Sequence, residues 1–580
     1  MMSLTSKIRI TILSLTALFL IILFSFSLFT NIQYPLMWGD EAETAVFSSR
    51  ILKFGYPKVH DGKNVMNFLL QTDKSVGIKQ KYDVYVGLPW LQYYFGTLGI
   101  KLSQFASGLY QQTGLIRIPF AGIGLLGVIL FPLIIVGLCS GWVKKLIAVN
   151  IFLLLELVSI PLVLHLREVR SYPITVFLYS LMLIAVSNYL IIKKIPYWLY
   201  FILVTLIPLL ILNNFTPAFP PLVFSLFIYL AFYWVGGKSF PRESGWGRFF
   251  GNGRALFGSY SKALLPLIIS GILAIPVILF FNMPQNAAGV SQSIGFSTGM
   301  YFGYLKRIIL FFLNYDNLIL LLFVLLVLAY LLQKAITRDK LVKDNSVYPL
   351  VHILNYLLIL FIVYILVVAR IPGLFDRYYI VLQPISSLII VLALFTIYKL
   401  ISINYGSKGG KSWRELFIYL LIPIVFANYL GKISLIKGHV YELTHRYQGP
   451  LDFIIPYLQK IYKDPSQLII EASHEQISYM YYLNSRVIYD YNPLSSENTL
   501  AVIPDVIVPV NFMVPEEFSV KVDKLLKENK YRKVSFPIYD YPANNIPELS
   551  ISLRHLFKTK LPEKESDQVY IYLNEATLNK

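Results

Sequence analysis

The sequence predicts a polytopic α-helical membrane protein with about eleven transmembrane helices and a C-terminal α/β domain on the extracytoplasmic side. Of its 580 residues, 56% are hydrophobic and only 14% are charged. A helix needs about 20 predominantly apolar residues to cross roughly 30 Å of hydrocarbon. Runs of that kind recur as far as residues 414–431 and are missing beyond them, so a membrane part comes first and a soluble part follows.

The first apolar run, residues 10–30, follows Lys7 and Arg9. Cytoplasmic flanks of membrane proteins carry an excess of Lys and Arg, so this order places the N-terminus in the cytoplasm. A signal peptide is the alternative, because it also has a basic start followed by an apolar stretch. The many apolar runs that follow favour an uncleaved first span.

About ten further spans are expected from length and apolar character. They are residues 116–138, 146–165, 172–192, 197–213, 217–235, 263–282, 306–332, 348–369, 377–398 and 414–431. An odd total places the C-terminus on the side opposite the N-terminus.

The distribution of basic residues supports this topology. Loops that alternate to the cytoplasm hold most of the Lys and Arg, as the positive-inside rule requires. The short outer loops hold only Arg167, Arg170, Lys306, Arg307, Arg370 and Arg377. We therefore predict a transmembrane domain, residues 1–435, whose residues 31–115 form a first extracytoplasmic loop with interfacial helices. Residues 436–580 form the extracytoplasmic α/β domain of a multi-pass cell-membrane protein.

The net charge of +19 does not indicate a nucleic-acid partner. Residues 437–580 hold 16 Lys and Arg against 18 Asp and Glu, so the positive charge belongs to the membrane part. Basic cytoplasmic loops favour the anionic inner leaflet. The lipid bilayer is therefore the expected partner of these charges.

The C-terminal part reads as an α/β domain. Short apolar runs at 468–471, 487–489, 505–508 and 569–572 predict strands, and 475–483 and 516–529 predict amphipathic helices. It holds no G-x-S-x-G, phosphate loop or metal-binding spacing. A docking or acceptor-binding module is therefore favoured over an independent enzyme.

The most informative segment is residues 38–43, Trp-Gly-Asp-Glu-Ala-Glu, directly after the first span. Only 14 acidic residues precede position 437, and Asp40, Glu41 and Glu43 are three of them. They begin an amphipathic segment that suggests a helix along the outer membrane surface. Asp40 as an N-cap with Glu43 at N3 is the structural alternative, but it leaves Glu41 unexplained.

Basic residues of the outer loops complete the candidate site. Residues 165–172 include Arg167, Arg170 and Tyr172, and residues 376–379 include Arg377 and Tyr378. Interfacial ion pairs with Glu168 and Asp376 would explain each group taken alone. Because charges near hydrocarbon are costly unless paired or used, and because a guanidinium suits a phosphate, an anion site is the functional alternative.

These residues together resemble the GT-C glycosyltransferases, the membrane class that includes protein O-mannosyltransferases and the aminoarabinose transferases of lipid A (glycosyltransferase family 39-like). The matching pieces are residues 39–42, 88–94, 115–119, 167–172 and 377–378. The order and topology of these pieces cover essentially all of residues 1–430.

The resemblance implies transfer of a sugar from a polyprenyl-phosphate carrier to a protein, lipid or glycan acceptor on the extracytoplasmic side, by a single inverting displacement. Asp40 is the candidate general base and Glu41 its partner. A divalent cation held by Asp40 and Glu41 is the one cofactor considered. The candidate residues for the donor phosphate or sugar are Arg167, Arg170, Tyr172, Arg377, Tyr378, Lys58 and His60.

Two non-enzymatic alternatives remain open on the residues alone. A transporter or lipid flippase with a surface domain would carry charges along a pathway and often shows inverted repeats. In this sequence the charges gather at one face, and no repeat is evident. A non-catalytic assembly scaffold is the other alternative, which the intact acidic motif disfavours.

Overall fold

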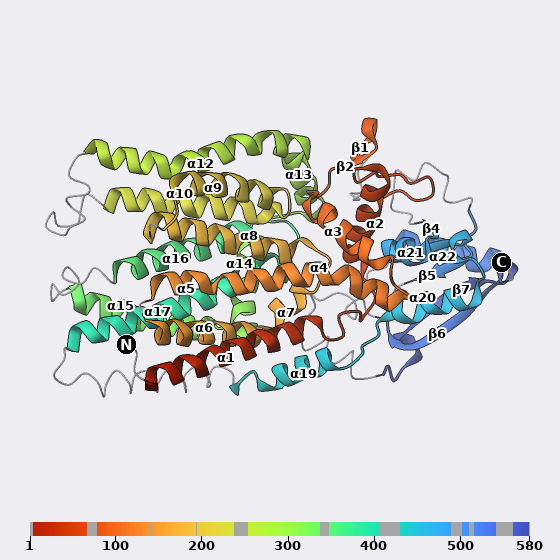
Figure 1. The fold of residues 1–580 in the computed structure, drawn as a ribbon. Coiled ribbons are helices and arrows are strands. Elements are labelled where there is room, and N and C mark those ends of the chain that lie inside the picture. The colour runs from red at the N-terminus through yellow and green to blue at the C-terminus, as the bar shows by residue number, and fades with distance from the viewer. Residues whose placement is uncertain are drawn as a thin grey trace.

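A computed structural model shows a bundle of long helices with a smaller α/β domain at one end (Figure 1). It describes residues 4–66, 78–139, 141–192, 194–236, 253–336, 347–405, 430–488, 502–509, 516–540 and 561–578. The helices of the bundle are α1 (Leu4–Phe29), α4 (Leu109–Leu130), α5 (Pro132–Leu138), α6 (Trp142–Leu157), α7 (Ile160–Leu166), α8 (Ser171–Val186), α9 (Tyr197–Leu212), α10 (Phe219–Gly236), α12 (Gly253–Phe280), α14 (Thr298–Tyr315), α15 (Leu318–Ile336), α16 (Tyr348–Val368) and α17 (Leu382–Tyr405).

Seven helices within the described ranges are long and apolar enough to cross a membrane. The number is eight if α6 and α7, which are bent by 77° at their junction, count as one span. Two shorter apolar helices lie at Tyr197–Leu212 and Thr216–Phe232. The expected span 414–431 lies almost entirely outside the described residues, so the predicted total of about eleven stays a prediction.

The expected span 306–332 is wrong as a single helix. The chain forms α14 and α15 there, and Asp316 and Asn317 separate them. Both residues are buried, and Asp316 Oδ1 accepts a hydrogen bond from Asn317 N at 2.9 Å. A short polar side chain that bonds its own backbone competes with helix formation, which explains the break.

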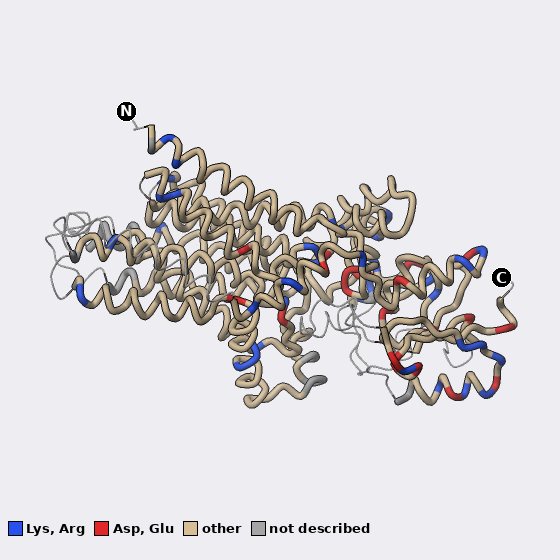
Figure 2. Tube along the Cα trace, turned by 90° about the horizontal axis from the view of Figure 1, so that it is seen from below, with Lys and Arg blue, Asp and Glu red and all other residues tan. Residues whose placement is uncertain are grey.

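Charged residues are rare in the middle of the bundle and gather at its two ends and in the C-terminal domain (Figure 2). The start of α1 and the C-terminal domain lie at opposite ends of the bundle (Figure 1). The end next to the C-terminal domain carries α2 (Gly39–Phe54), α3 (Leu91–Ser103), α13 (Met283–Ile294) and the short pair β1 (Ile78–Lys79) and β2 (Val84–Tyr85). The acidic segment, residues 38–43, therefore lies at the end of the bundle that the α/β domain covers.

The C-terminal domain contains a five-stranded mixed sheet in the order β4-β3-β5-β7-β6. The strands are β3 (Ile469–Ala472), β4 (Arg486–Ile488), β5 (Val506–Val508), β6 (Tyr531–Tyr539) and β7 (Gln568–Asn574), and the helices are α19 (Ile433–Thr444), α20 (Pro450–Ile461), α21 (Gln476–Leu483) and α22 (Glu516–Glu528). Strand β3 is parallel to β4 and β5, whereas β7 is antiparallel to β5 and β6. All four predicted strands and both predicted helices are confirmed.

Strand β6 was missed by the sequence analysis. Its burial alternates only weakly, because most of its side chains are half-buried or exposed. It is held by its long antiparallel pairing with β7, a contact that leaves little period-2 signal in the sequence.

Helix α2 does not use the capping box considered above. Trp38 is its N-cap residue and makes no side-chain capping bond, so the structural alternative for Asp40 and Glu43 is wrong. The helix ends at Gly55, which has a left-handed φ of 85°. Glycine is the residue that adopts this conformation without steric cost.

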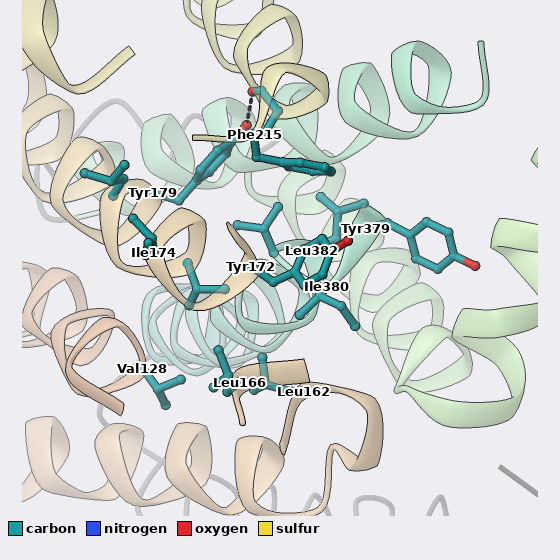
Figure 3. Packing of buried hydrophobic residues seen from close by; sticks show 14 of the residues in the cluster. Val128, Leu162, Leu166, Tyr172, Ile174, Tyr179, Phe215, Tyr379, Ile380 and Leu382 are labelled. Atoms are coloured by element: carbon teal, nitrogen blue, oxygen red, sulfur yellow. Dashed lines mark hydrogen bonds between the residues drawn. The ribbon is translucent and has the colours of Figure 1, made fainter. Parts of the chain in front are cut away.

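Buried apolar and aromatic side chains, among them Tyr172, Tyr379 and Ile380, pack together next to the segments that carry the candidate site (Figure 3). Tyr172 of α8 packs edge-on against Phe215, with ring centroids 5.5 Å apart. Because close-packed interiors hold side chains in single rotamers, this packing gives Arg170 and Arg377, which flank these residues in sequence, defined starting positions.

Candidate active site

Asp40 lies between two buried arginines that come from distant parts of the chain. Arg377 Nη2 donates to Asp40 Oδ2 at 2.8 Å, and Arg170 Nη2 lies 3.4 Å from the same oxygen. The arginine side chains are 6% and 8% exposed, whereas that of Asp40 is 29% exposed. One carboxylate, still open to solvent, therefore faces two guanidinium groups.

The segments that carry these side chains all begin helical structure. Asp40 is in the first turn of α2, Arg170 is the N-cap residue of α8, and Arg377 lies in the 3₁₀ turn Asp376–Tyr379 before α17. Helix N-termini carry partial positive charge, which adds to that of the guanidinium groups. The helix N-termini and the two guanidinium groups therefore place positive charge around the Asp40 carboxylate.

Glu43 adds a second carboxyl group one helical turn after Asp40. Its Oε2 lies 3.5 Å from Arg170 Nη1, and its Oε1 accepts a hydrogen bond from the Tyr93 hydroxyl. Burial raises the pKa of Glu43 above its ordinary value, against the opposing effect of Arg170. Glu43 thus meets Arg170 at Nη1, while Nη2 of the same guanidinium lies near Asp40.

Aromatic rings surround Arg377. Its guanidinium carbon lies 5.0 Å from the centre of the Trp38 ring, 4.5 Å from that of Phe375 and 5.9 Å from that of Tyr378. Cation–π contacts of this kind hold a desolvated guanidinium in place. Tyr378 therefore lies against Arg377, and the charges of Arg377 and Arg170 act on the nearby Tyr172 hydroxyl. A role of the two tyrosines in binding the donor stays a prediction.

Glu41 points away from Asp40 into a separate, fully buried network. Arg117 Nε donates to its Oε1 at 2.8 Å, Arg117 Nη2 bonds its Oε2, and Val169 N donates to Oε1 at 3.0 Å. Arg117 Nη1 also donates to the carbonyl oxygens of Ile32 and Pro35. With its lone pairs used in this way, Glu41 has a positioning role and does not fit a metal ligand shared with Asp40.

Three residues expected at the donor site lie elsewhere. Arg167 donates from Nη2 to the Thr30 carbonyl at 2.8 Å, which ties the end of α7 to the end of α1. Lys58 and His60 pair with Asp83, at 3.8 and 2.5 Å. The structure does not bring these three side chains to the arginine pair, so their predicted phosphate role is not supported by position.

The C-terminal domain reaches the same site through Glu475 and His474, in the connection between β3 and α21. Gly39 N, next to Asp40, donates to Glu475 Oε2. A Cβ atom on Gly39 would lie 3.2 Å from that oxygen, so glycine permits this close approach. Ser478 Oγ also donates to the Met37 carbonyl at 2.9 Å, and Met37 N donates to the Tyr482 hydroxyl at 2.9 Å.

We expect Glu475 to make stability depend on pH. Burial raises the pKa of its carboxyl to about 8, so the folded state binds a proton that the unfolded state loses near pH 4.5. Stability from this group is full below the unfolded pKa and is lost as pH rises toward the folded pKa. The melting temperature of wild type should therefore fall between about pH 5 and 8 more steeply than that of Glu475→Gln. If the melting temperatures of wild type and Glu475→Gln changed in parallel with pH, the raised pKa of Glu475 would be contradicted.

No group of three or more His, Cys, Asp or Glu side chains suited to a metal ion occurs among the residues that the structure describes. Near Asp40 the neighbouring groups are mainly cationic. Two guanidinium groups disfavour a divalent cation at this carboxylate by charge repulsion. The residues present therefore fit an anion better than the divalent cation considered from the sequence.

Several site residues were not identified from the sequence. Glu43 has a local signal, since it follows Asp40 by three positions and shares its helix face. Arg117 occurred in a matching segment but was given no role. Glu475 and His474 have no such signal, because 436 residues separate Gly39 from Glu475.

Comparison with known proteins supports the architecture. No family model matches the chain, and no curated protein matches its sequence. The crystal structure of ArnT from Cupriavidus metallidurans in the apo state aligns over 98% of both chains, with 12% identity and a TM-score of 0.52. The structure of ArnT from the same organism bound to undecaprenyl phosphate aligns over 98% of both chains, with 13% identity and a TM-score of 0.48. On the first of these alignments, the protein has the fold of ArnT.

Proposed function

We propose that the protein is a glycosyltransferase that moves a sugar from a polyprenyl-phosphate carrier to an acceptor hydroxyl on the extracytoplasmic side. One observation carries the proposal: Arg170 and Arg377, both buried, converge on the partly exposed carboxylate of Asp40. The shared fold with ArnT supports the reaction class.

The arginine pair suits the phosphate of the donor. Two buried donors of the cluster, Trp38 Nε1 and Arg170 Nε, have no hydrogen-bond partner among the described residues. Buried hydrogen-bond donors in native proteins are nearly always paired. An anionic ligand would supply the acceptors that these two donors lack. Phosphate oxygens accept such charge-assisted bonds well.

In the transfer step, the acceptor oxygen attacks the anomeric carbon while the bond from that carbon to the phosphate oxygen breaks. The new C–O bond forms on the opposite face of the sugar, and the configuration inverts. The acceptor hydroxyl's proton goes to Asp40, and the bond pair leaves with the polyprenyl phosphate. Arg170 and Arg377 stabilise the negative charge that develops on this leaving group.

Binding of the donor phosphate also frees Asp40 to act as the base. Without donor, the Asp40 carboxylate is held by both arginines. When phosphate oxygens share these guanidinium groups, the bonds to Asp40 weaken and its lone pairs become available to the acceptor. The same two arginines therefore couple carrier binding to activation of Asp40.

We expect Arg377→Ala to lose carrier binding. A bond between a buried charged pair contributes enough that removing one partner weakens binding by about tenfold or more. Native mass spectrometry of the purified protein with added undecaprenyl phosphate measures this, and Arg170→Ala should behave alike. Arg446→Ala is the matched control, since Arg446 is exposed and its guanidinium lies 5.9 Å from the Tyr34 ring.

Equal carrier binding in Arg377→Ala, Arg170→Ala and the control would contradict the phosphate site. If wild type binds no carrier and reconstituted vesicles instead show solute or lipid movement, the transporter or flippase alternative replaces the enzyme. A protein that does neither would be the non-catalytic scaffold.

A further inference from the structure

A hollow opens in the C-terminal domain beside the candidate active site. Most of its empty space is open to solvent at the mouth, and the enclosed part has room for about one or two water molecules. Its polar lining consists of His474, Glu475, Tyr479 and Asp540. The apolar lining comes from Pro450, Leu451, Ile454, Val508, Pro509 and Val569.

The hollow has a defined place in the sheet topology. After β3 the chain passes through α21 to β4 on one side, whereas β5, the other neighbour of β3, leads away through α22 toward β6. The carboxyl ends of β3 and β5 are therefore a topological switch point, where open α/β sheets bind ligands. His474 and Glu475 follow β3, and Val508 and Pro509 end β5, so the hollow opens at this point.

One buried polar atom in the lining lacks a partner. The side chain of Glu475 is 10% exposed, and its Oε1 has no hydrogen-bond partner among the residues that the structure describes. His474 Nε2 lies 3.7 Å from this oxygen, beyond hydrogen-bond distance. The other oxygen, Oε2, accepts from Gly39 N. Glu475 thus has one oxygen fixed on the start of α2 and one left for a ligand.

The hollow is connected to Asp40 through the same residues. Gly39 precedes Asp40, and it bonds directly to Glu475. The charge of Asp40 also acts on the neighbouring His474 imidazole, opposing the effect of burial, which lowers the pKa of His474. A ligand in the hollow would therefore have its reactive end near the candidate base.

We propose that this hollow is the acceptor subsite and that it receives one edge of a sugar unit, whose hydroxyl groups bond Glu475 and His474 while the rest of the ring lies over the open mouth. The inference rests on the proposed function and names its acceptor class. Carboxyl, imidazole and tyrosine groups match the mixed donors and acceptors of sugar hydroxyls, and the apolar floor matches the C–H face of a sugar ring. His474 and Glu475 direct one hydroxyl toward Asp40, while the arginine pair holds the donor.

Saturation-transfer NMR on the full chain tests the proposal. The protein is placed in lipid nanodiscs free of glycoside detergent, and methyl glycosides of glucose, mannose, galactose and N-acetylglucosamine serve as probes. We expect at least one probe to bind, and His474→Ala and Glu475→Gln to weaken its binding about two- to tenfold, the loss typical of a hydrogen bond between uncharged groups. His445→Ala is the control, because His445 is exposed and stacks on Tyr441 outside the hollow.

Two results would overturn the subsite. One is that no glycoside binds, or that binding is equal in all variants. The other is that acetyl-Gly-Ser-Gly-amide binds in a His474-dependent manner while the glycosides do not, which would assign the hollow to peptide. Unchanged undecaprenyl phosphate binding in the two variants excludes a general structural effect.

Two further experiments distinguish a lipid-linked from a soluble sugar, and sugar binding from the proposed transfer reaction. Competition of the glycoside signal by a glucosyl diacylglycerol in the nanodisc identifies the sugar as a lipid headgroup, and lack of competition identifies a soluble glycan. If glycosides bind as expected while wild type binds no undecaprenyl phosphate, the proposed transfer reaction fails and the sugar subsite stands.

Discussion

Asp40→Asn is expected to lower the rate of sugar transfer by about 10²–10⁴-fold, the usual contribution of a general base. The asparagine keeps the size and the contacts of the side chain but cannot take the acceptor's proton. It also removes the negative charge that Arg170 and Arg377 share, so carrier phosphate should bind at least as tightly as in wild type. A fall in kcat without a fall in donor affinity is therefore the expected signature.

The measurement combines transfer from a radiolabelled polyprenyl-phosphate sugar with undecaprenyl phosphate binding on the same preparations. Asp83→Asn is the matched control, because Asp83 is also an ion-paired carboxylate, in the segment between α2 and α3, but it pairs with Lys58 and His60. Its transfer rate should equal that of wild type. Full activity of Asp40→Asn would refute the base assignment.

Arg117→Ala is expected to destabilise the protein by about 3–5 kcal/mol, because removing one partner of a buried ion pair leaves the other charge uncompensated. Arg117 and Glu41 are 7% and 2% exposed, and they bond through two pairs of atoms. The change would also free the carbonyl oxygens of Ile32 and Pro35. The segment before α2 would lose its anchor, so activity should fall together with stability.

Arg307→Ala provides the comparison. Arg307 also pairs with a carboxylate, Asp376, but its side chain is 44% exposed, and exposed pairs contribute only about 0–1 kcal/mol. Thermal unfolding in detergent should separate the two variants clearly. If the Arg117→Ala protein were as stable as the Arg307→Ala protein, the Arg117–Glu41 pair would not anchor the segment before α2.

The membrane architecture and the strands of the C-terminal domain were predictable because each rests on local patterns. Apolar length marks a span, and short β-branched runs mark β3, β5 and β7. The break at Asp316 and Asn317 was missed because the flanking apolar runs are continuous enough to read as one helix. Strand β6 was missed because its stability comes from pairing with β7.

The site was predicted in part, for a physical reason that its residues illustrate. Asp40, Arg170 and Arg377 stand out as charges next to apolar spans, and burial of such charges needs a partner or a use. The direction of Glu41 could not be read from its neighbours, since it depends on Arg117 from another helix. Glu475 was out of reach because only the folded chain brings it to Gly39.

The hydrogen bonds between residues 36–39 and the C-terminal domain also set the order in which the protein matures. Leu36 N bonds Asp452 across 416 positions, and Gly39 N bonds Glu475 across 436. At about 5–20 residues per second, synthesis of that intervening chain takes roughly 20–80 s. During this interval residues 36–39 have been synthesised, but Asp452 and Glu475, which later bond Leu36 and Gly39, have not. Residues 36–39 of the nascent protein therefore gain these hydrogen bonds only after the C-terminal domain has been synthesised, so the candidate site is completed last.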